Sequence, residues 1–216
     1  MRKYLCSLAL PLALVLCSAG PAWADAYQDA LSAAALGHDG DLVELLDKGL
    51  DPNTVDASGN TLLILAARDD HLSTVDLLLK RKAKVAARNF SGDSALMMAV
   101  LKGHTAVAKR LLEAGAPVNH SGWTPLMYAA YEGRTDLVQL LLAKGADVNA
   151  RAPNLSTPLM LAARNGHMDA VRLLLKAGAE TELKNDQGFT AEAWANSAGN
   201  TDAADLIAAS KKGQVR

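Results

Sequence analysis

The feature that most constrains this chain is a pattern that returns about every 33 residues. Hydroxyl residues recur at Thr61, Ser94, Thr124, Thr157 and Thr190, with spacings of 33, 30, 33 and 33 residues. Five positions after each of them stands an alanine, and nine positions after all but the first stands a glycine. An apolar pair follows at positions seventeen and eighteen. A period of this length predicts stacked supersecondary units rather than one globular core.

Each unit has the pattern of a helical hairpin. In the copy that begins at Thr124, the hydroxyl is placed to cap a first helix, and Pro125 stands at a position where a missing amide costs little. Gly133 is expected to end that helix in a left-handed conformation. A second helix is predicted over 135–144, followed by Gly145. Its inward-facing residues are Val138, Leu141 and Leu142. One such hairpin cannot bury its apolar face alone, whereas stacked copies can.

The repeated residues resemble the ankyrin repeat family. Its T-P-L-H-x-A-A motif appears as the segment 157–163, and its G-A-D-V-N motif as 145–149. The resemblance implies an all-α ankyrin-repeat solenoid of about six helix-turn-helix units with β-turn fingers, and the pattern of the first residues predicts that a signal peptide precedes it. It also implies a single ankyrin-repeat domain over 25–216. The expected repeats are about 25–55, 56–88, 89–118, 119–151, 152–184 and 185–216.

The histidine of the family motif is where the first departure from the family pattern occurs. The motif histidine is absent, and Ile64, Met97, Met127 and Met160 stand in its place. The hydrogen bonds that this histidine makes in the family are therefore expected to be lost, with thioether packing as partial compensation.

The loops also depart from the family pattern. Lys82 occupies a position where a left-handed glycine is expected, which predicts local strain. The loop between Val118 and Thr124 is three residues shorter than the loop between Val148 and Thr157. This deletion predicts a notch in the row of fingers.

The first 24 residues have the pattern of a signal peptide. Arg2 and Lys3 precede a largely apolar run over 4–15, and the small-x-small triplet 22–24 predicts cleavage after Ala24. The apolar run is short for a membrane span, so we expect export to the periplasm without a stable membrane span after cleavage. A retained anchor helix is the alternative. Cys17 also permits a lipoprotein, but the bulky Leu16 before it disfavours lipidation.

The sequence offers no convincing catalytic, metal or cofactor motif. Both cysteines of the chain, Cys6 and Cys17, lie in the predicted signal peptide, so the mature chain has no thiol chemistry. His71, His104 and His167 follow the first helix of their repeats, where the family commonly carries a histidine, and are interpreted as structural. His120, in the short loop, is the one histidine with a candidate functional role. We therefore expect no enzyme, no metal and no cofactor.

Charge excludes nucleic acid as an expected partner. The chain has 22 basic and 23 acidic residues, and aromatic residues make up only 4%. The dense basic run 80–84 closes a second helix, where cations complement the helix dipole. A nucleic-acid surface would instead combine a basic domain with interleaved aromatic residues.

The family resemblance indicates where a protein partner would bind. Recognition falls on the fingers and on the two positions after the alanine pair of each first helix. Carried over to this chain, the candidate protein-binding residues are Arg68, Asp69, Arg88, Phe90, Leu101, Lys102, His120, Trp123, Tyr131, Glu132, Arg151, Arg164 and Asn165. The alternative for the aromatic members is packing between neighbouring fingers, and Tyr128 and Trp194 are expected in the inter-repeat core.

These patterns predict a non-enzymatic protein–protein interaction module of a bacterium, exported to the periplasm. Its expected partner is a periplasmic protein, most simply an enzyme that it modulates, protects or inhibits. Two alternatives stay open. One is a structural scaffold that joins envelope components, and the other is an enzyme with a site around His120.

Overall fold

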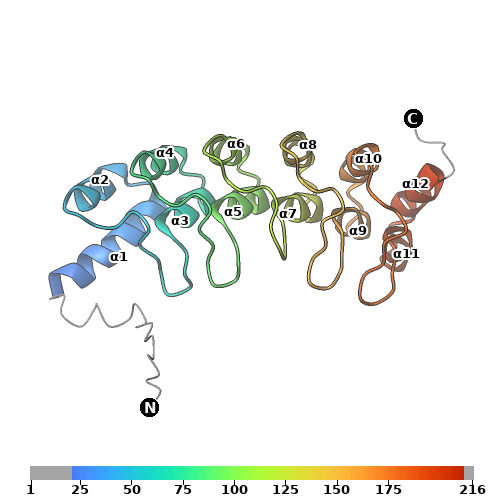
Figure 1. The fold of residues 1–216 in the computed structure, drawn as a ribbon, viewed down its shortest axis with the longest axis horizontal. Helices are drawn as coiled ribbons and strands as arrows, with labels where there is room; N and C mark the ends of the chain where they lie inside the picture. The colour runs from blue at the N-terminus through green and yellow to red at the C-terminus, as the bar shows by residue number, and fades with distance from the viewer. Residues whose placement is uncertain (1–20, 212–216) are drawn as a thin grey trace, which may run out of the picture.

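The computed structural model describes residues 21–211, which form paired helices in a linear stack (Figure 1). Residues 1–20, and with them nearly all of the predicted signal peptide, lie outside the described residues, as do 212–216. The pairs are α1 (Pro21–Leu36) with α2 (Asp39–Asp47), α3 (Leu62–Arg68) with α4 (Leu72–Lys80), α5 (Ala95–Lys102) with α6 (Thr105–Glu113), α7 (Pro125–Tyr131) with α8 (Thr135–Ala143), α9 (Pro158–Arg164) with α10 (Met168–Lys176), and α11 (Ala191–Ser197) with α12 (Thr201–Lys211).

The first helices of the pairs form one row and the second helices another, and the loops between units project as fingers (Figure 1). We number these fingers from the N-terminus. They are the first (48–61), second (81–94), third (114–124), fourth (144–157) and fifth (177–190). Within the described chain, bridges between extended residues are limited to one antiparallel pair in each of the first two fingers. The all-α solenoid of six hairpins is therefore confirmed.

Each first helix after α1 begins at a hydroxyl cap, as the spacing predicts. The side chains of Thr61, Ser94, Thr124, Thr157 and Thr190 accept hydrogen bonds from the amide three residues further on, at 3.2–3.3 Å. These bonds satisfy one of the amides that a helix start leaves unpaired. Because the cap fixes where each first helix begins, it also fixes where each finger ends.

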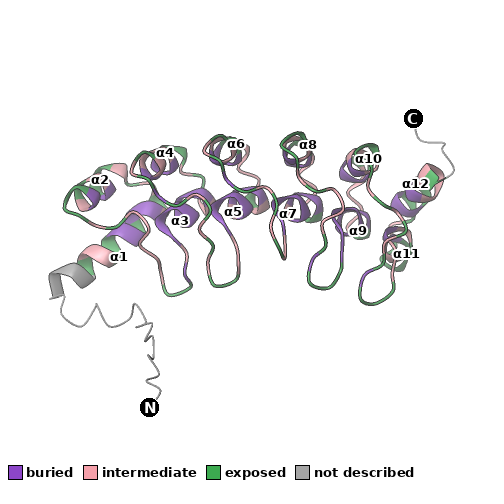
Figure 2. Ribbon diagram, viewed as in Figure 1, coloured by how far each residue is buried: buried purple, intermediate pink, exposed green. Residues whose placement is uncertain are grey.

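The core is a continuous seam between the two rows of helices, coloured purple in Figure 2. The repeated alanines of the first helices are almost completely buried: Ala33, Ala66, Ala99, Ala129, Ala162 and Ala195. Their small side chains let adjacent first helices approach closely. The second helices contribute larger buried residues, such as Leu78, Leu111, Leu141 and Leu174. Each unit thus buries its apolar face against its neighbours.

Histidines connect successive units through the backbone. The Nε2 atoms of His71, His104 and His167 each lie 2.9 Å from the carbonyl oxygen 36 residues earlier. In the last unit, Asn200 donates to the Arg164 carbonyl in the same way. The structural interpretation of these three histidines is confirmed. In the fourth unit the position is taken by Arg134, whose buried Nε has no hydrogen-bond partner within the described chain.

The methionines in the histidine position do more than fill space, which corrects the expected loss of hydrogen bonds. The sulfur atom of Met97 accepts a hydrogen bond from the backbone amide of Ser94, and that of Met160 accepts one from the amide of Thr157, both at 3.4 Å. They therefore replace part of the bonding of the absent imidazole. Met127 instead packs with Ala152 and Leu161 in a small second cluster.

Candidate protein-binding surface

The third finger is visibly shorter than its neighbours (Figure 1). It spans 114–124, three residues fewer than any other finger, so the predicted notch is present in the row. Its base is held to the fourth finger by Asn119, which donates to the Gly145 carbonyl at 2.8 Å and accepts from the Asp147 amide at 2.8 Å. The deletion therefore shortens the tip of the finger and leaves its base connected.

Three aromatic rings gather beside the notch, at the junction of the third finger with α7. The Trp123 ring lies 5.1 Å from the ring of Tyr128 and 6.0 Å from that of Tyr131, in an edge-to-face arrangement with the latter. Tyr131 keeps 38% of its surface exposed, and Trp123 is half-buried against the cluster around Met127. We call Trp123, Tyr128 and Tyr131 the aromatic cluster. It joins the predicted contacts Trp123 and Tyr131 into one surface.

Tyr128 anchors this cluster to the second finger. Its hydroxyl donates to Asp93 at 2.7 Å. Burial of the phenol, followed by the hydrogen bond and the charge of Asp93, raises the pKa of Tyr128 above its ordinary value. The side chain therefore stays a neutral donor at physiological pH. This contact and the packing of Trp194 on both core clusters confirm that Tyr128 and Trp194 belong to inter-repeat packing.

Phe90 is the most exposed large apolar side chain of the described chain, with 82% of its surface accessible. Its ring edge nevertheless rests on the preceding finger, because a Cβ atom at Gly59 would lie only 2.8 Å from Cδ1 of Phe90. The backbone amide of Phe90 also donates to the Ser58 carbonyl at 3.1 Å. Phe90 thus packs between fingers and is open to a partner at the same time.

Several of the predicted contact residues are already bound within the chain. Arg68 and Asp69 form an ion pair at 2.6 Å, and the Arg164 guanidinium lies 4.8 Å from the ring centre of Trp194. Asn165 donates to the Tyr131 carbonyl at 2.8 Å. The guanidinium of Arg151 donates to the Lys184 carbonyl at 2.6 Å. Arg151, Arg164 and Asn165 thus join neighbouring units in the free protein, whereas Arg68 and Asp69 pair within one unit.

The remaining predicted residues differ in how accessible they are. Arg88 donates to the Gly92 carbonyl and, at 3.4 Å, to the Ser121 carbonyl across the notch. Lys102 is exposed, whereas Leu101 and Glu132 are half-buried. The His120 ring lies 3.0 Å from the Ser121 carbonyl through Nδ1 and 3.1 Å from the Met97 sulfur through Nε2. The imidazole thus faces a carbonyl and a thioether rather than a carboxylate.

Sequence reasoning missed one residue of this surface, Leu155. It lies in the fourth finger with 41% of its surface exposed and a left-handed φ of 60°. The aligned positions of the other fingers are glycines with positive φ: Gly59, Gly92, Gly122 and Gly188. A leucine where four aligned positions carry glycine is a signal that the sequence did contain. A leucine in this backbone conformation costs conformational free energy in the folded state.

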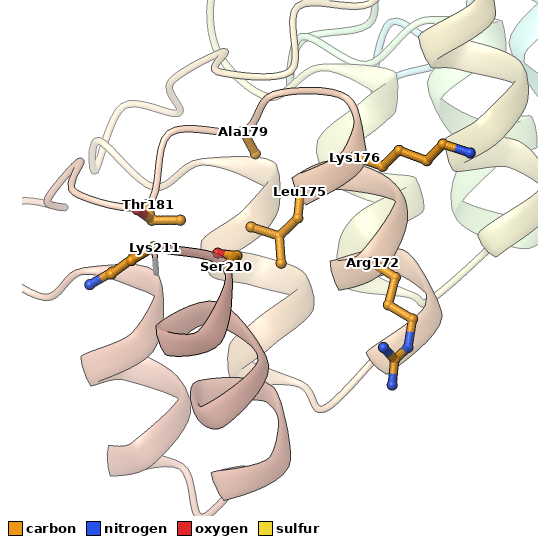
Figure 3. Close-up of a pocket in the computed structure, with 7 residues that line it drawn as sticks. All are labelled: Arg172, Leu175, Lys176, Ala179, Thr181, Ser210 and Lys211. Atoms are coloured by element: carbon orange, nitrogen blue, oxygen red, sulfur yellow. The ribbon is translucent and has the colours of Figure 1, made fainter. Parts of the chain in front are cut away.

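A hollow lies elsewhere, between the ends of α10 and α12. It measures about 510 Å³, with Leu175, Ala179, Thr181 and Ser210 around it (Figure 3). The charged ends of Arg172, Lys176 and Lys211 point away from its centre in the same view. Lys211 is paired with Glu182 and Glu192, each at 2.7 Å. The hollow therefore presents an apolar wall without a converging set of reactive groups.

Neither a metal site nor a membrane span is found within 21–211. No group of three or more metal-ligating side chains converges there. Asp69, Asp70 and His71, adjacent in sequence, contact Arg68, His104 and the Ala35 carbonyl respectively. None of the helices in that range combines the length and the apolar character that crossing a bilayer requires.

Two solved structures are similar to this chain over about four fifths of its length. One is a chain in the complex of a predatory endopeptidase from Bdellovibrio bacteriovorus with an immunity protein. It is 32% identical with a TM-score of 0.75, over 83% of this chain and 96% of that chain. Another is the ankyrin repeat domain of Bcl-3, a member of the IkappaB protein family. It is 30% identical with a TM-score of 0.70, over 81% of this chain and 80% of that chain.

Curated relatives match over shorter segments. A glycerophosphocholine phosphodiesterase of Schizosaccharomyces pombe is 39% identical over 77 residues, which is 35% of this chain and 7% of that enzyme. A putative ankyrin repeat protein of Rickettsia bellii is 35% identical over 75 residues, which is 34% of this chain and 41% of that protein. The matched segments thus span less than half of either relative.

A family model of ankyrin repeats in three copies matches residues 30–120, 84–152 and 151–215, which together cover most of the chain. The capped hairpins, the buried alanines and the fingers agree with this match. Ankyrin repeats are generally non-enzymatic protein-binding units. The chain belongs to the ankyrin repeat family and is a protein–protein interaction module.

Proposed function

We propose that this protein is exported to the periplasm and there binds and inhibits a peptidase. One observation carries the proposal, the similarity to a chain from the complex between an endopeptidase and its immunity protein. That similarity includes 96% of the other chain at 32% identity, so it extends over the whole stack rather than one repeat. That complex pairs an endopeptidase with an immunity protein, and a stack of repeats offers the extended surface that such a partner requires.

The binding surface supports the same function. The aromatic cluster, Phe90 and Leu155 lie on or beside the second, third and fourth fingers. Tyrosine and tryptophan are the residue types that most often dominate interface free energy, because they bury a large area at a small entropic cost. A chain with only 4% aromatic residues places several of them here. This surface is therefore the one we assign to the peptidase.

The binding test uses the tagged mature chain, residues 25–216, and an envelope extract of the source bacterium. The proposal expects one stoichiometric peptidase to be captured, and its activity to fall to zero at one equivalent of added chain. Capture of many partners at low stoichiometry would contradict it and favour a scaffold. Undiminished activity of the captured enzyme would contradict inhibition.

A matched pair of variants locates the binding surface. Tyr131→Ala removes an exposed ring of the aromatic cluster and should weaken inhibition by about tenfold or more. Leu72→Ala removes a side chain of the same 38% exposure at the start of α4 and should leave inhibition unchanged. Thermal unfolding of both variants shows whether a loss of binding reflects a loss of folding.

Export is tested separately. The segment 1–24 and the absence of cysteine from 25–216 suit an exported protein in an oxidising compartment. Mass spectrometry of the protein from the periplasmic fraction should find Asp25 as the first residue. A lipid-modified Cys17 as the first residue would instead show a lipoprotein. Recovery of the uncleaved chain from the cytoplasm would contradict export.

A further inference from the structure

The row of fingers is joined by backbone hydrogen bonds except at the third finger. The Phe90 amide of the second finger donates to the Ser58 carbonyl of the first, and the Asp186 amide of the fifth donates to the Asn154 carbonyl of the fourth, both at 3.1 Å. In the part of the chain that the structure describes, no backbone bond joins the third finger to either neighbour. The fingers therefore form two pairs joined by backbone bonds, and the short third finger between them is joined to its neighbours only through the side chains of Asn119 and Arg88. We call the space left by its shortened tip the gap.

The repeat register shows which backbone groups the gap leaves open. Ser91 occupies the position of Ser58 and Asn154, the two residues whose carbonyls accept the bonds between fingers. Between residues 21 and 211 no group donates to the Ser91 carbonyl. The matching donor position of the third finger is His120, whose amide makes no backbone bond to Ser91. Pro153, in the donor position of the fourth finger, has no amide hydrogen to give to the third finger. The shortened finger thus leaves the Ser91 carbonyl as an open acceptor.

The side chains around this gap are basic and apolar. The Arg88 guanidinium crosses it to the Ser121 carbonyl, and its Nη2 atom lies 3.0 Å from where a Cβ at Gly92 would stand. The acidic residue nearest to Ser91 in the sequence is Asp93, and its carboxylate already accepts a hydrogen bond from the Tyr128 hydroxyl. Trp123 stands at the base of the short finger, and Leu155 is exposed on the fourth finger. A complementary ligand therefore combines a carboxylate with an apolar side chain.

We infer that the gap above the third finger binds an extended, acidic loop of the captured protein. The loop takes the place of the missing fingertip, donates a backbone amide to the Ser91 carbonyl, and directs a carboxylate to Arg88 and an apolar side chain toward Trp123 and Leu155. Addition of an extended segment to an open backbone edge is a general mode of peptide recognition. This inference deepens the proposed function, since it names the part of the partner that the module holds.

The test uses random twelve-residue peptides displayed on phage and selected on the purified mature chain. The selection should enrich peptides in which Asp or Glu stands next to an apolar residue. No enrichment, or enrichment of basic peptides, would overturn the inference. Because no peptidase is needed, failure here leaves the proposed inhibition standing, and failure of inhibition leaves this result standing.

A variant that fills the gap provides the structural control. Inserting three residues between His120 and Ser121 restores the length of the other fingers and should weaken binding of the selected peptides at least tenfold. The same insertion between Asp186 and Gln187 lengthens the fifth finger and should change binding less than twofold. Equal binding by both insertion variants would contradict the inference, as would peptide binding that depends on Tyr131 but not on the gap.

A chemical change in the peptide tests the backbone bond without any change in the protein. N-methylation of each peptide amide in turn removes one donor at a time. One position should lose binding about tenfold, and that loss should be absent in the variant with the filled gap. A uniform effect of methylation along the peptide would contradict the bond to Ser91. Concentration-dependent dimerisation that the insertion abolishes would show that a second copy occupies the gap, and would overturn the assignment to a partner loop.

Discussion

At the scale of residues, a non-glycine residue in the left-handed conformation lowers the free energy of unfolding of the unit that contains it. Lys82 has a φ of 63° where the aligned residues Gly49, Gly115, Gly145 and Gly178 have values of 83–99°. Lys82→Gly should therefore raise the free energy of unfolding by about 0.5–1 kcal/mol, because glycine removes the clash of Cβ with the backbone. Chemical denaturation measures this change.

The second left-handed position supplies the control for Lys82. Asp70 has a φ of 65°, yet aspartate tolerates this conformation better than lysine, and its carboxylate lies 3.5 Å from His104. Asp70→Gly should therefore stabilise the protein less than Lys82→Gly. The reverse order would show that backbone strain does not control these sites.

Glycines that face the next unit should be far less replaceable than glycines that face solvent. At Gly133 (φ 65°) a Cβ would lie 2.5 Å from Nδ1 of His167, whose Nε2 bonds to the Tyr131 carbonyl. Gly133→Ala should cost about 2–3 kcal/mol, from backbone strain and the displaced histidine. Gly145→Ala meets open space and should cost about 1 kcal/mol. Equal losses in thermal unfolding would refute the role of His167 as a connector.

Residue-level structure was predictable where position in the repeat determines it. The caps at Thr124 and Thr157 and the left-handed Lys82 follow from alignment alone. The bonds of Arg68 and Arg151 were not predictable, because a long side chain chooses among several acceptors that the fold brings near. These contacts depend on the spacing between units, which the sequence does not show.

At the scale of elements, the methionine sulfurs stabilise the starts of α5 and α9. Met97 and Met127 are both buried, but of the two only Met97 accepts a backbone hydrogen bond at sulfur, from the Ser94 amide. Met97→Leu should therefore lower the free energy of unfolding by about 1 kcal/mol, and Met127→Leu by less than about 0.5 kcal/mol. Urea denaturation distinguishes the two. Identical effects would mean that the sulfurs act only through packing.

The bond between α7 and the second finger should make stability depend on alkaline pH. The pKa of Tyr128 is raised in the folded protein, so its neutral form contributes stability that is fully present below about pH 10, the ordinary tyrosine value. That contribution is lost as pH rises toward the folded pKa, at no more than about 1.4 kcal/mol per pH unit. Tyr128→Phe should be less stable than the wild type at pH 7.

The wild type and Tyr128→Phe should become more alike in stability above pH 10, because the wild type then loses the contribution of the neutral phenol. Tyr27, whose pKa burial also raises, is present in both and serves as an internal control. Denaturation at pH 7, 9 and 11 measures the difference. A constant difference across this range would contradict the role assigned to the phenol.

Helices were easier to predict than fingers, for a physical reason. The helix predicted over 135–144 is observed as Thr135–Ala143, because apolar spacing and caps determine helices locally. The short third finger follows from counting residues, but the open Ser91 carbonyl depends on the register between neighbouring fingers. The binding residues inferred from the sequence thus stay a prediction, while Leu155 and the gap could be found only in the assembled stack.

At the scale of the whole molecule, the stack is a sum of similar units with one irregularity in length. Every unit contacts only its neighbours, so rigidity comes from repetition of the same caps, alanines and connecting histidines. The irregularity lies in the third finger, next to the aromatic cluster. Regular stacking of the repeats explains the fold. The chain departs from a regular stack where the shortened third finger interrupts the backbone bonds between fingers.

Hydrogen–deuterium exchange of the mature chain, alone and bound to the captured peptidase, tests this account most directly. Binding should slow exchange in the second and third fingers, the tip of the fourth and the end of α7, and leave the outer row of second helices unchanged. Slower exchange confined to those second helices, or an exchange pattern that the peptidase does not alter, would contradict it.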